Sequence, residues 1–363
     1  MLARLRPPHL IAMCAKSIPT ELTEVDWCGA FKPARRIRWW LTTIAPDLRR
    51  RHGLPPPHTP AEANRIWNEV EQGRWLDLNP WMDIIKYLPP GMAEHIESWL
   101  NEPNRTPWQF KEHHPDVTVP NLDVSGWYDH CNGTIGHLPG MQQHGRSETA
   151  RTQTKIILGP WSHVNAGHRT NGKIDFGPQA EVDLIDISIR WFDHWLKGLD
   201  NMVDRDPSVQ YFVMGLNKWR TATTWPPEET EDRLFFLSHT EDARELTKGH
   251  LQPEADSLEV EDHYSYDPKN PVSTLWSSDL FTSVSDRRQL EHREDILIYR
   301  SSPLEIDVEI AGVPRVSLYA RSSAPDTVFL PDWLMNILMA KPLRYVMVWS
   351  GRDIGTVWTK KNS

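Results

Sequence analysis

Two short segments of this sequence place an acid and a base where they could move a proton. Gly126-Trp-Tyr-Asp129 follows the apolar run at residues 122–125, and Gly159-Pro-Trp-Ser-His163 follows the run at residues 156–158. A neutral imidazole accepts the proton of an attacking hydroxyl and returns it to a leaving group, while a carboxylate orients the imidazole and stabilises its charged form. Asp129 and His163 are therefore candidates for an acid–base pair. On spacing alone, two ordinary loop residues are the commoner interpretation.

The elements expected to position these residues are buried parallel strands at residues 121–126 and 155–159, each ending in glycine. Functional groups of open α/β sheets lie at the carboxyl ends of such strands. An Asp in one loop and a His in a later loop also follow the α/β-hydrolase chain order of Ser, Asp or Glu, then His. The apolar periodicity of residues 181–197, closed by Gly198, predicts a helix, and the alternation of residues 209–213 predicts a strand.

The flanking regions differ in pattern. A short apolar run at residues 9–15 indicates a strand, and residues 25–115 alternate three- and four-residue apolar spacing with proline clusters, which predicts helices at 35–44, 61–70 and 92–100. From about Arg233 helical periodicity is absent, and strands are expected at residues 234–237, 296–299, 304–310 and 316–320. This pattern is typical of an all-β sandwich, so a domain boundary is expected near residues 226–232.

Composition excludes several classes of function. The net charge of −9 and the scattered Lys and Arg residues give no basic face, so no nucleic-acid partner is expected. The three cysteines are unpatterned and indicate neither a disulfide framework nor a thiolate metal site. No apolar run approaches the roughly 18 residues that span a bilayer, and Pro7 and Pro8 interrupt any signal-peptide pattern. We expect a cytoplasmic protein without cofactor or membrane partner, and the sequence leaves the oligomeric state open.

Several motifs in order resemble one known family. Gly126-Trp-Tyr-Asp129 resembles the acid loop, and Gly159-Pro-Trp-Ser-His163 the histidine loop, of the cocaine-esterase and Xaa-Pro dipeptidyl-peptidase-like (CocE/NonD) hydrolases. Further similar segments are Asp175-Phe-Gly-Pro178, the helix ending at Gly198, Val213-Met-Gly-Leu-Asn-Lys-Trp219 and Ser323-Ala-Pro-Asp-Thr327. The resemblance extends from about Leu5 to Phe329 and is strongest after Pro120.

The resemblance implies an α/β fold in three parts. Residues 1–24 and 116–228 would form a partial α/β-hydrolase core without its early strands, residues 25–115 an inserted helical cap, and residues 229–363 an incomplete jelly-roll β-sandwich. It also implies a serine hydrolase that cleaves a small-molecule ester, amide or peptide through an acyl-enzyme, with Asp129 orienting His163 as general base and then general acid.

The sequence departs from the family at both ends. The family's Gly-x-Ser-Tyr-x-Gly nucleophile elbow is absent, and no Gly-x-Ser-x-Gly occurs in the 363 residues. The segment at residues 3–10 resembles the helix after the elbow, which would place the serine, and with it both oxyanion donors, before Met1. After Thr327, Val328 replaces the expected Asp, and residues 330–342 match nothing in the family. These departures suggest a truncated N-terminus and an aberrant C-terminus, so the chain as written is expected to be inactive.

Other residues with chemical potential are weaker candidates. Ser17, Ser125 and Ser162 lack an elbow, and Cys131 has no paired thiolate site. The run at residues 113–116, His-His-Pro-Asp, lacks the spacing of metal ligands, so a solvated turn is expected. His137 and His168 are interpreted as surface-loop residues, and Asp193 with His194 as anchors of the helix that carries them.

Three interpretations of function stay open at this point. The first is the serine hydrolase, incomplete as written. The second is a pseudo-enzyme that acts as a non-catalytic binding module for a carbohydrate or a partner protein, and the third is a chain that does not fold independently. A clean absence of an in-frame elbow upstream of Met1 would favour the second, whereas a cooperative unfolding transition would exclude the third.

Overall fold

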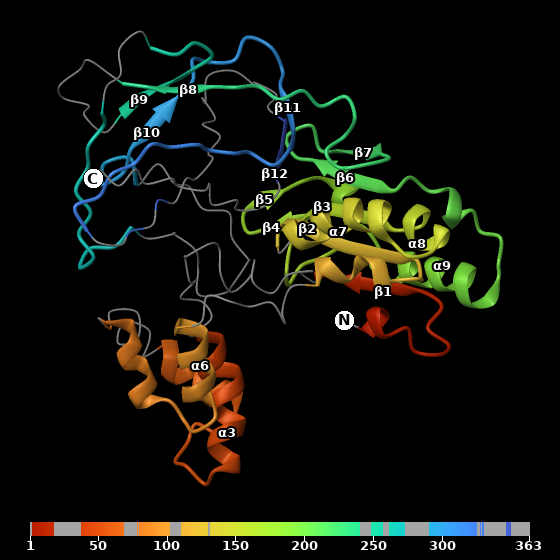
Figure 1. Ribbon diagram of the computed structural model, residues 1–363, viewed down its shortest axis with the longest axis horizontal. Coiled ribbons are helices and arrows are strands. Elements are labelled where there is room, and N and C mark those ends of the chain that lie inside the picture. The colour runs from red at the N-terminus through yellow and green to blue at the C-terminus, as the bar shows by residue number, and fades with distance from the viewer. Residues whose placement is uncertain are drawn as a thin grey trace. The chain divides into compact units, whose positions relative to one another are not determined.

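The structure is a computed structural model that describes residues 2–17, 38–68, 78, 80–101, 110–129, 131–239, 248–256, 261–272, 290–324, 327, 329 and 346–349 (Figure 1). The chain forms two compact units, one of residues Glu21–Gln109 and the other of residues Met1–Thr20 with Phe110–Ser363. The further division expected at residues 228 and 229 stays a prediction.

A five-stranded sheet lies at the centre of the larger unit, in the order β1-β2-β3-β6-β7. Its strands are β1 (Met13–Lys16), β2 (Asn121–Tyr128), β3 (Lys155–Ser162), β6 (Val209–Val213) and β7 (Lys218–Ala222). The first four are parallel and β7 pairs with β6 antiparallel. Every residue of β3 is buried, and only the last residue of β2 is not, as expected of parallel strands covered on both faces.

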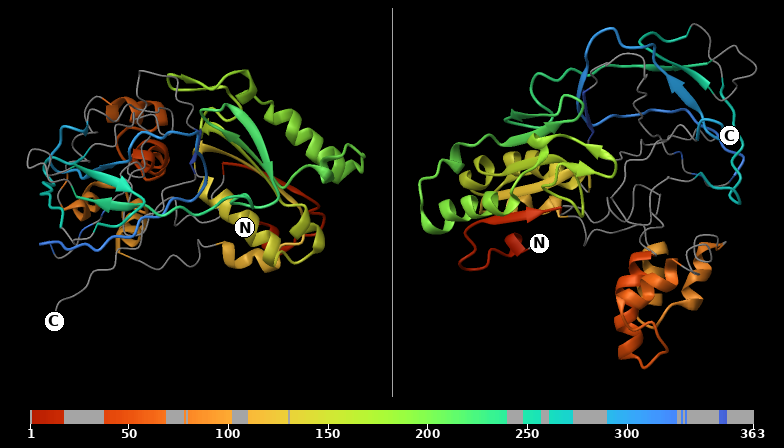
Figure 2. Two further views of the ribbon diagram at one scale, coloured as in Figure 1. Left: turned by 90° about the horizontal axis from the view of Figure 1, so that it is seen from above. Right: turned by 180° about the vertical axis from the view of Figure 1, so that it is seen from behind.

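Helices cover both faces of this sheet, as Figures 1 and 2 show. On one face lie α7 (Cys131–His144) and α8 (Glu148–Thr152), with the short 3-10 helices η1 (Leu2–Leu5) and η6 (Lys111–Asp116) beside them. On the other lies α9 (Leu184–Lys197), whose Trp191 is fully buried against residues of β2 and β3. The mixed α/β fold predicted from the sequence is confirmed at this level.

The ends of α9 follow from its sequence. Asp183 precedes the helix, and its carboxylate accepts hydrogen bonds from the backbone N–H groups of Ile185 and Asp186. Gly198 ends it with a left-handed backbone at φ 69°. The helix predicted from Glu181 therefore begins three positions later, because Asp183 is its N-terminal cap. At its C-terminal end, Asp193 pairs with Lys197 within the helix and His194 contacts the Leu199 carbonyl just beyond it. The anchoring role predicted for Asp193 and His194 stays a prediction.

Helices make up the described part of the smaller unit. They are η2 (Trp40–Ile44, a π-helix), α3 (Ala45–Arg51), α4 (Pro60–Ile66), η4 (Trp81–Tyr87, a 3-10 helix) and α6 (Met92–Asn101). Trp40, Trp67 and Ile96 are buried in its core. Thr59 and Glu62 form a reciprocal capping box at the start of α4. The predicted helices are confirmed where they are described, and residues 35–37, 69 and 70 of those predictions lie outside the described residues.

The region after Arg233 contains short strands. β8 (Phe236–Ser238), β9 (Lys248–Gln252) and β10 (Ile298–Arg300) form one sheet, and β11 (Glu309–Gly312) pairs with β12 (Val346–Trp349). The hairpin of β4 (Thr170–Asn171) and β5 (Ile174–Asp175) and the 3-10 helices η7 (Pro178–Ala180) and η8 (Val203–Arg205) complete the larger unit. The strand predicted at residues 316–320 is wrong for the structure as described. Its side chains alternate in exposure, but among the described residues the segment forms no strand and only Tyr319 makes an isolated bridge.

Candidate active site

Asp129 and His163 lie side by side at the carboxyl ends of β2 and β3. The Nδ1 atom of His163 is 3.0 Å from Oδ1 of Asp129, a distance at which the ring N–H donates to the carboxylate. The Asp129 side chain is fully buried, whereas 44% of the His163 side chain is exposed. The two loops singled out in the sequence are thus adjacent because their strands are neighbours in the sheet.

The electrostatics of this pair favour a protonated imidazole. The hydrogen bond to Asp129 raises the pKa of His163 above its ordinary value, against the opposing effect of partial burial. The charge of the carboxylate acts in the same direction as the hydrogen bond. A carboxylate that stabilises the imidazolium in this way makes His163 a better proton acceptor.

Backbone and side-chain hydrogen bonds hold both loops. The N–H of Asp129 donates to the Gly126 carbonyl at 2.9 Å, closing a tight turn after β2. After β3, the Asn165 carboxamide oxygen accepts from the Ser162 N–H at 2.7 Å and from the Ser162 hydroxyl at 2.6 Å. The Asn165 amide group then donates to the Thr170 carbonyl. Asn165 was not identified from the sequence, where its only signal is its position two residues after the histidine.

The serines weighed as substitute nucleophiles lie in unsuitable places. Ser125 is fully buried within β2, and the Ser162 hydroxyl is committed to Asn165. Ser17 directly follows β1, with a positive φ of 53°. The side chain of Cys131 lies outside the described residues. Of the described positions, neither Ser125 nor Ser162 has the exposed strand-to-helix turn that a nucleophilic serine uses in α/β-hydrolases.

The prediction for His137 as a surface-loop residue is wrong, and His114 is not solvated either. Both are buried, and Nε2 of His114 is 3.0 Å from Nδ1 of His137. Nε2 of His137 lies 3.8 Å from Oδ2 of the buried Asp123 on β2. Burial lowers the pKa of His137 to about 4 and raises the pKa of Asp123 to about 7. The ring of His114 fits only because position 140 of α7 is glycine, where an added Cβ would lie 2.2 Å from that ring.

The remaining candidates have local structural partners. Nε2 of His113 is 2.7 Å from the Arg4 guanidinium, and its Nδ1 is 3.3 Å from Asp116. His168 is exposed. Within the described ranges, no group of three or more His, Cys, Asp or Glu side chains is arranged to hold a metal ion. No helix in the described part of the chain is long and apolar enough to cross a membrane.

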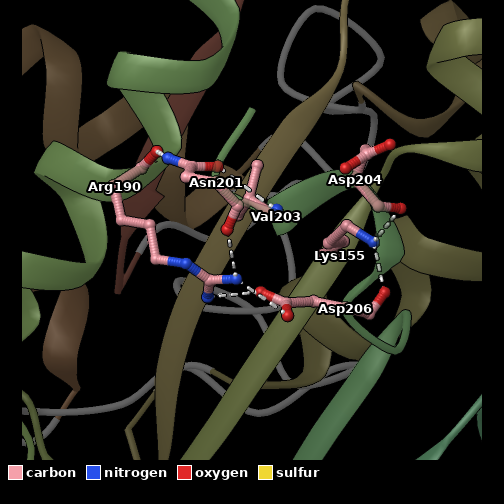
Figure 3. Close-up of polar contacts among 6 residues, drawn as sticks. All are labelled: Lys155, Arg190, Asn201, Val203, Asp204 and Asp206. Atoms are coloured by element: carbon pink, nitrogen blue, oxygen red, sulfur yellow. Dashed lines mark hydrogen bonds and ion pairs between the residues drawn. The ribbon is translucent and has the colours of Figure 1, made fainter. Parts of the chain in front are cut away.

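A polar cluster at the opposite end of β3 holds that strand in place (Figure 3). The Lys155 ammonium at the start of β3 donates to the backbone carbonyls of Asp204 and Asp206, in and just after η8. Arg190 of α9 binds both carboxylate oxygens of Asp206, at 2.6 and 3.1 Å, and the Asn201 carbonyl at 3.2 Å. The strand that carries the histidine loop is thereby tied to the helix that covers it.

Comparison with known proteins gives consistent sequence matches. Residues 201–335 match the family described as the X-Pro dipeptidyl-peptidase C-terminal non-catalytic domain. The cocaine esterase of Rhodococcus sp. (strain MB1 Bresler) is 31% identical over 229 residues, which cover 59% of this chain and 37% of that protein. A putative Xaa-Pro dipeptidyl-peptidase of Streptomyces avermitilis is 38% identical over 79 residues, which cover 22% of this chain and 10% of that protein. The chain thus spans 37% or less of the length of these two relatives.

Solved structures show weaker similarity. An aminopeptidase from a Thaumarchaeota archaeon of marine sediment gives a TM-score of 0.46 at 23% identity, covering 59% of this chain and 37% of its own. A CocE/NonD family hydrolase from Staphylococcus aureus gives a TM-score of 0.39 at 16% identity, covering 70% and 36%. The sequence matches, to cocaine esterase, to the Xaa-Pro dipeptidyl-peptidase and to the C-terminal domain of that class, make this chain similar to the CocE/NonD-like hydrolases.

Proposed function

We propose that Asp129 and His163 are the acid–base half of a serine hydrolase that cleaves an ester or amide bond through an acyl-enzyme. The observation that carries the proposal is the 3.0 Å contact between a buried carboxylate and a partly exposed imidazole at adjacent strand ends. In this proposal Asp129 fixes the tautomer of His163. His163 removes the proton from the attacking hydroxyl and then delivers it to the leaving group.

The substrate class proposed is a small ester or a peptide. It is supported by the names of the relatives, which are a cocaine esterase, putative serine esterases and a putative Xaa-Pro dipeptidyl-peptidase. A protonated imidazole is the form that donates to a leaving group, and the raised pKa of His163 favours that form.

We propose that these 363 residues do not supply the nucleophile of this reaction and that the chain alone forms no acyl-enzyme. The sequence contains no Gly-x-Ser-x-Gly, and Ser125 and Ser162, the serines nearest the pair in sequence, are buried. Incubating the purified chain with a fluorophosphonate probe, beside a cocaine esterase as positive control, is expected to label the control alone. Stoichiometric labelling of this chain would contradict the proposal.

The pair itself is tested without catalysis. Titration of the His163 ring by NMR is expected to give a pKa above the ordinary value of about 6.5, and Asp129→Asn is expected to lower it. Asp193→Asn, which changes a carboxylate in α9, is the matched control and is expected to leave the His163 titration unchanged. An unchanged titration in Asp129→Asn would contradict the assignment of Asp129.

The finer architecture is part of the same proposal. Residues 1–24 and 116–228 would be a partial α/β-hydrolase core that lacks its early strands, and residues 229–363 a β-sandwich of the jelly-roll type. The short strands β8 to β12 and the match of residues 201–335 to a C-terminal domain support the second assignment.

A binding module is the second candidate function. The match of residues 201–335 is to a domain described as non-catalytic, which favours a role in recognition for that region. Sequencing the transcript upstream of the Met1 codon separates the two. An in-frame Gly-x-Ser-Tyr-x-Gly favours the enzyme, and an in-frame stop codon without it favours the binding module.

A further inference from the structure

The spacing of the two motifs differs by one residue, since the acid loop reads Gly-x-x-Asp and the histidine loop Gly-x-x-x-His. We propose that the extra residue is a β-bulge at Pro160–Trp161, with Trp161 packed into the space left by Gly126 and Gly159, and that this bulge places His163 opposite Asp129. The inference rests on the proposed function and assigns Trp161 as a positioning residue of that site.

The pairing register of β2 and β3 shows where the extra residue lies. Gly126 lies opposite Gly159, yet Tyr128 lies opposite Ser162, and the register shifts between these two pairs. One residue of β2, Trp127, therefore faces two residues of β3, which defines a bulge. Asp129 and His163 are the next residues after the Tyr128–Ser162 pair.

A regular ladder through the same residues, without the bulge, would give a different site. Continued from Gly126 and Gly159 in regular pairing, the register would set Asp129 opposite Ser162 and carry His163 one position further. Because successive side chains of a strand point to opposite faces, a slip of one residue turns the imidazole away from its partner. The contact between Asp129 and His163 is therefore a consequence of the bulge.

The two glycines are what allow the bulge to lie against the neighbouring strand. A Cβ at position 126 would lie 2.2 Å from the carbonyl oxygen of Trp161. A Cβ at position 159 would lie 2.3 Å from the indole ring of Trp161. Real Cβ atoms do not approach other heavy atoms so closely, so any larger residue at either position must displace the Trp161 backbone or ring.

The two motif tryptophans fix the bulge from both faces of the sheet. Trp161 is fully buried on the α9 face, and its indole N–H donates to the Ala180 carbonyl at 3.0 Å. Trp127 is fully buried in a separate cluster with α7 residues, and its indole N–H donates to the Phe212 carbonyl of β6 at 2.7 Å. Each aromatic side chain thus combines packing with a directed hydrogen bond, which leaves the bulge little freedom to slide.

The register is tested first in the unmodified protein by NMR. Cross-strand nuclear Overhauser contacts are expected to follow the pairing of Tyr128 with Ser162. Contacts that pair Tyr128 with Trp161 would show a regular ladder and overturn the inference. This measurement does not depend on the folding of any variant.

The positioning role is tested by Gly126→Ala, with Gly136→Ala as the matched control. Position 136 lies in α7 with nothing within 4 Å of an added Cβ. Gly126→Ala is expected to lower the pKa of His163 most of the way to its value in Asp129→Asn, while Gly136→Ala leaves it unchanged. A folded Gly126→Ala protein whose His163 titrates as in the unmodified protein would overturn the positioning role.

Failure of the inference and failure of the proposed function give different results. If Asp129→Asn leaves the His163 titration unchanged, the proposed acid–base pair fails, whatever the register. If Asp129→Asn lowers the pKa of His163 and Gly126→Ala does not, the pair stands and the positioning role of the bulge fails.

Discussion

Asp129 and His163 differ sharply in exposure although their side chains are in contact. The carboxylate is completely buried, and 44% of the imidazole side chain is exposed. A buried acid that orients an accessible base suits proton exchange with a bound substrate. The same arrangement links the protonation of His163 to the stability of the fold.

The first prediction concerns stability against pH. The pKa of His163 is higher in the folded than in the unfolded protein, so its protonation adds to the free energy of unfolding. This contribution is fully present below about pH 6.5 and is lost as pH rises through the folded pKa. Denaturant unfolding at a series of pH values is expected to show this loss, and Asp129→Asn is expected to reduce it. His168→Gln, which changes an exposed histidine, serves as control, and an equal slope in Asp129→Asn would contradict the prediction.

The second prediction concerns Asn165. Asn165→Ala leaves the Ser162 hydroxyl and N–H without their acceptor, so it is expected to lower the free energy of unfolding by about 1–3 kcal/mol. Asn165→Asp retains an acceptor oxygen for Ser162 but turns a carboxylate oxygen toward the Thr170 carbonyl, and because that contact is exposed the variant is expected to cost less than Asn165→Ala. Thermal and urea unfolding check the order, which equal losses would contradict.

The third prediction compares two arginine–carboxylate pairs. Arg190 and Asp206 join α9 to the segment that also binds Lys155 (Figure 3). Arg169 and Asp175 instead pair across the exposed hairpin of β4 and β5. Arg190→Ala is expected to lower the free energy of unfolding by about 1–2 kcal/mol, since hydrogen bonds to charged groups are lost and a network is broken. Arg169→Ala is expected to lower it by about 1 kcal/mol or less. A larger loss for Arg169→Ala than for Arg190→Ala would contradict this ranking.

The fourth prediction concerns the buried Asp123. Burial raises its folded pKa to about 7, whereas the unfolded carboxyl has a pKa of about 3.8. The free energy of unfolding is therefore highest below about pH 3.8 and falls as pH rises to about 7, because the unfolded state ionises first. Asp123→Asn cannot ionise, and it is expected to become more stable than the unmodified protein as pH rises through this window. A stability difference that does not vary between pH 4 and 8 would contradict the prediction.

The sequence predicts the elements that carry the site, because their signals are local. Strand β3 contains the apolar run Ile156–Leu158, and β2 has Leu122 and Val124 ahead of a glycine. Helix α9 has an acidic cap, a periodic apolar face and a terminal glycine. The neighbouring strand ends also follow, since parallel strands place their carboxyl ends together. Each of these features can be predicted without knowing which distant residues the element will contact.

The bulge and the buried histidines depend on residues far apart in the chain. In the sequence, Gly126 and Gly159 are typical of ordinary strand ends. Their role depends on Trp161, which packs against both of them in the folded structure. Helix α7 has no clear signal in the sequence, because Gly133, Gly136, Gly140 and Pro139 lower its intrinsic propensity. Gly140 there makes room for His114, an interaction that no local pattern encodes. Among the late strands, alternation identifies segments but does not choose their partners.

The place of the helical unit in the chain has a consequence for the folding route. Met13 of β1 is the sheet partner of Asn121 of β2, and residues Glu21–Gln109 lie between them in the chain. Closing a flexible loop costs an entropy that grows with about the logarithm of its length, and contacts between distant residues slow folding. An insert that folds early replaces many flexible residues by one compact body. It thereby lowers the entropy cost of bringing β1 to β2. The recruitment of β1 into the sheet is therefore coupled to the folding of a unit whose described residues contribute no strand to it.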